Sequence, residues 1–345
     1  MEITFEGRTY PCSEGETVLD ALLRGGVEHP FSCKVGTCLT CLARAAKGDL
    51  TARAQKGLKP TLVTQGYFLP CVCEPKGPLQ VAGAEDADLF GRAVVTRKEM
   101  AAPDVARIWL RPAMPLYYRA GQFVNLRRAD GLQRSYSVAS VPQLDEDLEL
   151  HVKSMPRGRM STWICDELQV GEALDVQGPN GDCFYLPGSP DQPLLLVGTG
   201  TGLAPMIGVA RDALMSKHSG PIRLYHGALD PPGFYLEAEL RALAGEHSSV
   251  EVHFCLSGDE EAERQATEKP KENYRIGFSN DLALADQPGL KGWRVYLCGH
   301  PAMVKAAKKA SYLAGAEMAD ILADPFDFQE LRTELRDEPE PLNVW

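Results

Sequence analysis

The spacing of three cysteines near the N-terminus constrains this chain more than any other feature. Cys33, Cys38 and Cys41 follow the pattern C-x4-C-x2-C, and Cys71 follows at a distance. This is the ligand spacing of a plant-type [2Fe-2S] cluster. Three thiolates on one loop can hold two irons only if the backbone wraps closely around them. The first quarter of the chain is therefore predicted to hold a one-electron carrier on these four cysteines.

Other uses of these cysteines remain open. Zinc also binds thiolates, but structural zinc sites usually have paired C-x2-C knuckles, and here only Cys38 and Cys41 are so spaced. A disulfide framework is disfavoured because ten cysteines in 345 residues without a secretory segment indicate a reducing cytosol. Cys73 competes with Cys71 for the fourth ligand position. The spacing favours Cys71, which leaves Cys73 as a buried thiol.

Length and composition predict a cytoplasmic protein of three domains. The chain has 345 residues and 44% hydrophobic content, enough for several cores. It has no run of 18 apolar residues, and it begins with acidic residues rather than a basic stretch. The net charge of -11 argues against nucleic acid, whose phosphates require a basic surface. We therefore expect a monomer that binds neither nucleic acid nor a membrane.

The spacing of predicted elements divides the chain into three parts. The first reads as a small β-rich domain, with a hairpin over residues 2–12 and a helix over Thr17–Arg24. The second has short strand-like runs separated by Pro and Gly, which suggests an antiparallel barrel or a sandwich. The third alternates apolar strands with helices, which predicts a parallel sheet. The predicted domains are residues 1–84, 89–187 and 190–326, followed by an acidic tail at 327–345.

Two apolar strands of the third domain each run directly into glycine. Leu194–Val197 precedes the glycine loop Gly198–Gly202, and Val295–Leu297 precedes Cys298-Gly299. Ligands of open α/β sheets bind at such strand ends, and the amides of a glycine loop before a helix can approach a pyrophosphate. The spacing is G-x-G-x-G rather than the dinucleotide fingerprint G-x-G-x-x-G. A tight strand-to-helix connection is therefore the alternative reading.

The chain as a whole resembles the ferredoxin-NADP reductase superfamily, in the subgroup of oxygenase reductases with an N-terminal ferredoxin domain. The resemblance runs from residue 1 to about Phe326 and includes naphthalene and benzoate dioxygenase reductases. Besides the cysteines, it rests on the flavin motif Arg134-Ser-Tyr136-Ser137 and on the segments Gly198–Pro205 and Cys298–Pro301. It implies a multidomain fold with a β-grasp ferredoxin domain, an antiparallel β-barrel FAD domain and an α/β parallel-sheet NAD(P)H domain. It also implies FAD beside the [2Fe-2S] cluster.

The resemblance implies roles for individual residues. Arg134 would bind the FAD pyrophosphate, Tyr136 would pack against the isoalloxazine ring and Ser137 would lie near its N5. A second flavin-phosphate segment carries Gly158 and Ser161. The cofactor-binding residues implied in this way are Arg134, Ser135, Tyr136, Ser137, Gly158, Ser161, Gly198, Gly200, Thr201, Gly202, Cys298 and Gly299.

Ser137, Cys298 and Phe326 would surround the hydride path. Cys298 is expected to shape the site rather than to act as a nucleophile. Phe326 resembles the C-terminal aromatic residue that shields the flavin, although it could equally pack the sheet edge. Two positions depart from the family pattern, since Leu39 and Arg157 stand where the family usually has glycine. These departures leave the conformation of both loops open.

The preferred coenzyme is predicted to be NADH rather than NADPH. Asp230, after the strand that contains His226, would repel a 2'-phosphate, and no basic residue lies nearby in the sequence. His226 itself is predicted to be a packing or hydrogen-bonding residue rather than a catalyst.

The predicted cofactors together indicate electron transfer from NADH through FAD to the cluster. A nicotinamide delivers two electrons as hydride and a cluster accepts one at a time, and a flavin, which has three oxidation states, can convert between them. The favoured function is the reductase component of a Rieske-type or diiron oxygenase, or of another protein electron acceptor. The alternatives are a stand-alone NADH:acceptor reductase for quinone or ferric compounds, and a redox-sensing module without turnover. The identity of the acceptor stays open.

Overall fold

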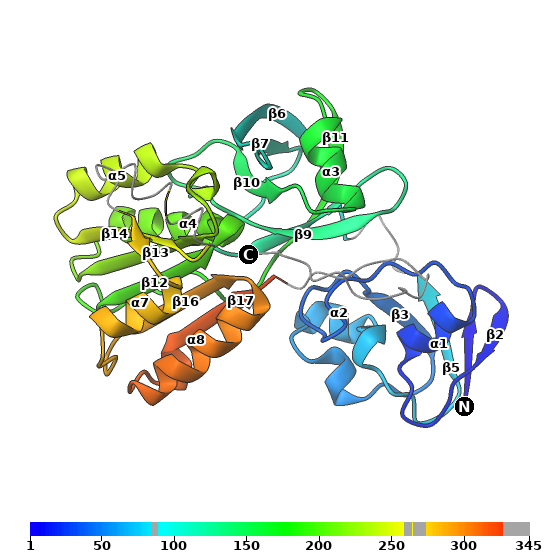
Figure 1. Cartoon of the computed structure of the whole chain (residues 1–345). Coiled ribbons are helices and arrows are strands. Elements are labelled where there is room, and N and C mark those ends of the chain that lie inside the picture. The colour runs from blue at the N-terminus through cyan, green and yellow to red at the C-terminus, as the bar shows by residue number, and fades with distance from the viewer. Residues whose placement is uncertain (84–88, 259–263, 265–273, 327–345) are drawn as a thin grey trace. The chain divides into compact units, whose positions relative to one another are not determined.

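The computed structural model describes residues 1–83, 89–258, 264 and 274–326 (Figure 1). The strands among these residues form three sheets. The chain divides into two compact units. The first unit comprises Met1–Arg92, Asn125–Ser135 and Leu174–Gly178, and the second unit comprises the rest. The predicted tail at 327–345 lies outside the described residues, and the exact domain boundaries remain predictions.

The first sheet belongs to the β-grasp part of the chain and has the strand order β2-β1-β5-β3-β4. The predicted hairpin is confirmed, because β1 and β2 pair in antiparallel register. The predicted helix is confirmed as well, with the Thr17 side chain accepting a hydrogen bond from the Asp20 amide at its start. The elements are β1 (Glu2–Phe5), β2 (Arg8–Pro11), α1 (Val18–Arg24), β3 (Ala43–Lys47), η1 (Ala52–Gln55), α2 (Pro60–Thr64), β4 (Tyr67–Phe68), η2 (Pro70–Val72) and β5 (Leu79–Gly83).

The second sheet has the order β10-β7-β6-β11-β8-β9, and its strand β7 pairs antiparallel with both β6 and β10. The sequence runs that read as strands, which begin at Gly91, Val105, Gln122 and Leu148, fall on β6, β7, β8 and β10. The sequence pattern missed β11, whose residues Ala-Leu-Asp-Val-Gln-Gly-Pro-Asn include glycine and proline. The elements are β6 (Gly91–Ala102), β7 (Val105–Pro112), β8 (Phe123–Arg127), β9 (Gln133–Ser137), β10 (Leu148–Lys153), α3 (Arg159–Asp166) and β11 (Ala173–Asn180).

The third sheet is parallel, as the alternation of strands and helices predicted, with the order β15-β14-β13-β12-β16-β17. The two glycine-terminated strands, β12 and β16, are neighbours inside it. The strands are β12 (Leu194–Thr199), β13 (Ile222–Ala228), β14 (Val250–Leu256), β15 (Arg275–Ile276), β16 (Arg294–Gly299) and β17 (Ile321–Pro325). The helices are η4 (Gly200–Gly202), α4 (Leu203–Met215), η5 (Pro231–Gly233), α5 (Glu237–Glu246), α7 (Ser279–Asp286), α8 (Pro301–Leu313) and η7 (Met318–Asp320).

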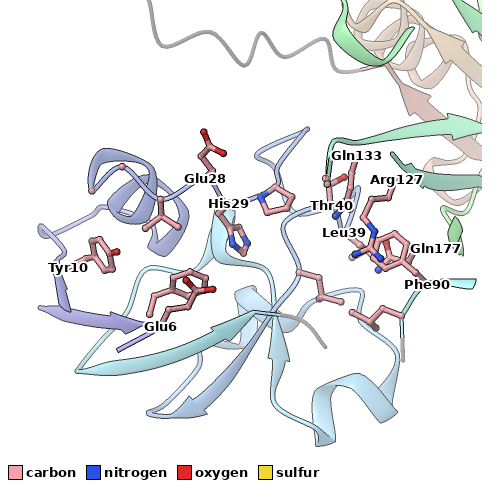
Figure 2. A pocket seen from close by; sticks show the side chains of 18 of the residues that line it. Glu6, Tyr10, Glu28, His29, Leu39, Thr40, Phe90, Arg127, Gln133 and Gln177 are labelled. Carbon is pink, nitrogen blue, oxygen red and sulfur yellow. The ribbon is translucent and has the colours of Figure 1, made fainter. Parts of the chain in front are cut away.

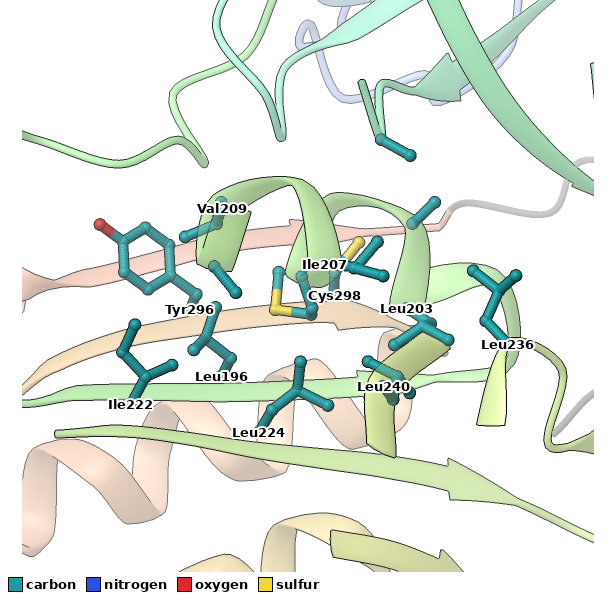
Figure 3. Packing of buried hydrophobic residues seen from close by; sticks show 14 of the residues in the cluster. Leu196, Leu203, Ile207, Val209, Ile222, Leu224, Leu236, Leu240, Tyr296 and Cys298 are labelled. Atoms are coloured by element: carbon teal, nitrogen blue, oxygen red, sulfur yellow. The ribbon is translucent and has the colours of Figure 1, made fainter. Parts of the chain in front are cut away.

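Helices cover both faces of the parallel sheet (Figure 1), which explains why the central strand β12 is apolar over Leu194–Val197. Leu194 and Leu196 on β12 face the core shared with α4 and α5, and Figure 3 shows Leu196 packed there with Cys298. Leu195 and Val197 face the opposite core, with residues of α7 and α8. None of the helices among the described residues is long and apolar enough to cross a bilayer.

Candidate cofactor and nucleotide sites

The four cysteines predicted as cluster ligands are buried in the first unit, where their sulfurs lie in two pairs. The Cys33 sulfur accepts the amides of Val35 at 3.5 Å and Cys38 at 3.4 Å. A hydrogen bond from the Cys38 thiol lowers the pKa of the Cys33 thiol, and a hydrogen bond from the Cys41 thiol lowers the pKa of the Cys71 thiol. Two irons with two protein thiolates each would require such pairs.

The structure separates Cys71 from Cys73. Cys71 packs in one buried cluster with Cys41, next to the predicted ligand loop. Cys73 is fully buried in a different cluster, together with Cys12, and burial raises its pKa to about 11. Cys71 therefore lies with the predicted ligand Cys41 and Cys73 lies apart from it, which supports Cys71 as the fourth ligand.

Leu39 adopts the backbone conformation that glycine would favour. Its φ is +59°, in the left-handed region, which costs a residue with a Cβ about 1–2 kcal/mol. The leucine side chain is partly buried against the apolar cluster that contains Cys41. The loop therefore keeps a glycine-like path at this position, with the packing of Leu39 offsetting the strain.

Asn125 forms a fully buried polar contact with the ligand loop, inside the first unit. Its Nδ2 donates to the Cys38 carbonyl oxygen at 2.8 Å and to Gln177 Oε1 at 2.7 Å. Its Oδ1 accepts the Ser135 hydroxyl at 2.6 Å. Both amide hydrogens and the carbonyl oxygen of Asn125 are thus satisfied without water. The sequence did not predict this role, because a single asparagine in a strand belongs to no recognisable motif.

A cavity of about 670 Å³ in the first unit lies beside the same loop (Figure 2). Its walls include Tyr10, His29, Thr40, Arg127 and Gln133. None of the residues predicted from the sequence to bind metal or cofactor lines it, so this cavity is distinct from the predicted sites.

The flavin motif lies on β9, where its last residue is joined to a distant carboxylate. Ser137 is buried, and its hydroxyl donates to Asp324 Oδ2 at 3.2 Å. Asp324 lies on β17 opposite Cys298 in register, and burial holds the pKa of the Cys298 thiol well above its usual value. Ser137, Asp324 and the Cys298 segment are therefore brought together. Asp324 was not predicted, although it stands two residues before Phe326.

The other motif residues, Arg134, Ser135 and Tyr136, are half-buried on β9. Arg134 donates to the neighbouring Gln133 carbonyl oxygen at 2.6 Å. A guanidinium is the side chain that pairs with a phosphate in bidentate geometry, which is the role predicted for Arg134.

The second flavin-phosphate segment is the start of a helix. Gly158 is the N-cap of α3, whose first-turn amides can bind an anion. Ser161 is buried, and its Oγ accepts the Met155 amide at 3.1 Å, so this hydroxyl oxygen also has a structural partner. Arg157 has φ +60°, the left-handed conformation that a second glycine would take.

The glycine loop and the Cys298-Gly299 segment pack backbone against backbone. A Cβ at Gly198 would lie 2.8 Å from the Gly202 carbonyl oxygen, and one at Gly202 would lie 2.4 Å from the Cys298 carbonyl oxygen. Gly299 has φ +121° and faces Thr199 in the same way. Close packing therefore explains why Gly198, Gly202 and Gly299 must be glycine.

Gly200 differs from its neighbours because no atom lies within 4 Å of its Cβ position. It lines a pocket of about 280 Å³ in the second unit, together with Asp104, Lys153 and Asp230. The Lys153 ammonium pairs with Asp104 at 3.2 Å. Asp230 also caps η5, since its side chain accepts the Gly233 amide at 3.0 Å. Lys153 is a pocket residue that the sequence reasoning missed.

Phe326 lies beside the Cys298-Gly299 segment. Its backbone amide donates to the Gly299 carbonyl oxygen at 2.8 Å, and its side chain is half-buried against the core that contains Cys298. Both readings of this residue, flavin shield and sheet-edge packing, are consistent with that position.

Three protein families match successive parts of the chain. They are described as a 2Fe-2S iron-sulfur cluster binding domain over residues 2–76, an oxidoreductase FAD-binding domain over 92–185 and an oxidoreductase NAD-binding domain over 196–309. Together they show that the protein is an oxidoreductase that uses a [2Fe-2S] cluster, FAD and NAD(H).

Proteins similar over nearly the whole chain include the reductase subunit of an aromatic O-demethylase from Amycolatopsis, 35% identical over 89% of this chain and 93% of that protein. The reductase component of a naphthalene 1,2-dioxygenase system from Pseudomonas putida is 30% identical over 94% and 98%. A crystal structure of an Amycolatopsis cytochrome P450 reductase matches with a TM-score of 0.66 and 33% identity, over 94% and 98%. The chain therefore belongs to the ferredoxin-NADP reductase superfamily, in the group of oxygenase reductases with an N-terminal [2Fe-2S] domain.

Proposed function

We propose that this protein is the reductase component of an oxygenase system, which takes electrons from NADH and delivers them singly to an oxygenase. The observation that carries this proposal is that one chain combines the paired thiols of Cys33, Cys38, Cys41 and Cys71 with a flavin motif and a nucleotide pocket. Relatives named as oxygenase reductase components, matched over almost their whole length, support it.

The residues present fit the implied cofactors. Four buried thiols in two pairs suit two irons. Arg134 and the N-terminus of α3 would hold the phosphates of FAD, and Tyr136 would pack against its ring. When bound, FAD supplies the conversion between two-electron and one-electron transfer. The protein itself fixes the orientation of the side chains around the flavin. The Ser137 hydroxyl, for example, donates its proton to Asp324, which fixes the orientation of the serine side chain.

The pocket at Gly200 would receive NADH. Lys153 and Gly200 line this pocket, so the ammonium of Lys153 would provide positive charge for a pyrophosphate and the glycine loop would provide backbone amides. The carboxylate of Asp230 would disfavour a 2'-phosphate, so we propose NADH over NADPH. None of the ten cysteines forms a disulfide with another, in keeping with the proposed cytoplasmic location. The monomeric state stays a prediction.

Lys153→Met is expected to raise the KM for NADH about 10- to 100-fold, because a charge-assisted hydrogen bond contributes about 1.5–3 kcal/mol. The value of kcat should stay within about twofold, since the lysine would bind ground state and transition state alike. Steady-state ferricyanide reduction measures both constants. The control is Lys305→Met on the exposed side of α8. An unchanged KM in the Lys153 variant would remove this residue from the binding site.

The acceptor is tested by reconstitution with Rieske, diiron and cytochrome P450 oxygenases, the last because of the related P450 reductase. We expect one class to form product in proportion to the NADH consumed. Equal rates with small quinones or ferric compounds and no preference for any protein acceptor would favour a stand-alone acceptor reductase instead.

A further inference from the structure

His226 lies in the protein interior directly behind the glycine loop. It is fully buried on β13, opposite Gly198 of β12 in parallel register. Its Nε2 is 3.2 Å from the Gly200 carbonyl oxygen. A carbonyl oxygen can only accept, so Nε2 must carry the proton and donate. The other ring nitrogen, Nδ1, has no hydrogen-bond partner in the described structure.

The surroundings of His226 keep its ring neutral and fixed. The edges of Phe234 and Tyr235 meet it at centroid distances of 5.5 and 5.7 Å, with interplanar angles of 75° and 90°. Burial lowers the pKa of His226 to about 4, so the ring is uncharged at neutral pH. It therefore acts as a single neutral donor aimed at Gly200.

The peptide group that follows the Gly200 Cα is hydrogen-bonded through its carbonyl oxygen. Its carbonyl oxygen accepts both the His226 ring and the Leu203 amide, while its Cα faces open space in the pocket. Its φ of +53° is a left-handed conformation that glycine adopts without strain, so the backbone itself does not fix the orientation of this peptide. In a planar trans peptide the N–H points away from the C=O. Fixing the Gly200 oxygen toward His226 therefore directs the Thr201 N–H to the opposite side.

We propose that His226 is a positioning residue for the nicotinamide coenzyme, which holds the Gly200–Thr201 peptide with its N–H available to the coenzyme pyrophosphate. This rests on the proposed binding of NADH at the glycine loop. In this proposal the affinity for the coenzyme depends on one hydrogen bond from the His226 side chain, although this side chain does not contact the coenzyme.

The test is equilibrium binding of NAD+ to the oxidised holoprotein, measured by calorimetry. His226→Phe keeps a ring but removes the donor, and it should raise the Kd about tenfold, the effect of one buried hydrogen bond. His226→Gln places an N–H donor near the position of Nε2 and should restore the Kd to within about threefold of the wild type. The ratio of variant to wild-type Kd should stay constant from about pH 6 to 9, because a neutral ring does not titrate there.

The matched control is His253→Phe, since His253 also lies on a strand of this sheet but stacks on Tyr225 at 4.4 Å. It should leave the Kd unchanged. FAD content and melting temperature establish that each variant is folded. Unchanged NAD+ binding in His226→Phe, or equal losses in the Phe and Gln variants, would overturn the positioning role while leaving the proposed function intact. A wild-type protein that binds neither NAD+ nor NADH would overturn both.

Discussion

Replacing Cys71 with alanine is expected to stop the reduction of protein electron acceptors while NADH-dependent reduction of ferricyanide continues. The cluster needs four thiolates, and loss of one from the Cys41–Cys71 pair leaves an iron without its ligand. Cytochrome c reduction should fall at least about a hundredfold, equivalent to about 2.7 kcal/mol in barrier height. The measurement combines iron analysis, the visible spectrum and the two steady-state rates.

Cys73→Ala is the control for this experiment, because it removes a thiol two residues away that lies in the apolar core. It should retain two irons per chain and near wild-type rates, with only the small loss of stability that a shortened buried side chain brings. If Cys73→Ala lost the iron and Cys71→Ala kept it, the ligand assignment would be wrong.

The second large effect is expected from Gly202→Ala. The added Cβ would lie 2.4 Å from the Cys298 carbonyl oxygen and 2.9 Å from the Gly299 nitrogen, both of them backbone atoms that cannot rotate away. The two nucleotide segments would have to separate, at a cost of about 1–3 kcal/mol. We expect kcat/KM for NADH to fall about 10- to 100-fold, with FAD content unchanged.

Gly245→Ala in α5 serves as the matched glycine control, since no atom lies within 4 Å of its Cβ position. Alanine in a helix should stabilise the protein by up to about 1 kcal/mol without altering the kinetics. A Gly202→Ala enzyme with wild-type kcat/KM would mean that the tight contact between the segments is not needed for nucleotide use.

The sequence was most informative where the chemistry is local. Three of the four predicted cluster ligands lie within nine residues, Cys33 to Cys41, and metal coordination dictates their spacing. Strand runs that alternate with helices likewise predicted the parallel sheet that contains β12 and β16. The sequence could not tell whether Leu39 would keep a glycine-like backbone, because that depends on packing that offsets strain.

What the sequence missed depends on distant partners. Ser137 and Asp324 are 187 residues apart and meet only because β9 and β17 are brought together by the fold. Lys153 reaches the Gly200 pocket from the end of a strand in a different sheet. The glycines of the loop also have different roles in the structure. Gly198 and Gly202 are needed for close packing, whereas Gly200 faces the pocket, and the sequence spacing alone does not predict this difference.

The most direct test of the account is the anaerobic addition of NADH to the purified protein, followed by visible absorbance and electron paramagnetic resonance. We predict that the flavin and iron-sulfur bands both bleach and that a resonance signal from one reduced [2Fe-2S] cluster per chain appears. A protein whose flavin band bleaches while the iron-sulfur band and the resonance spectrum stay unchanged would contradict electron transfer from NADH to the cluster.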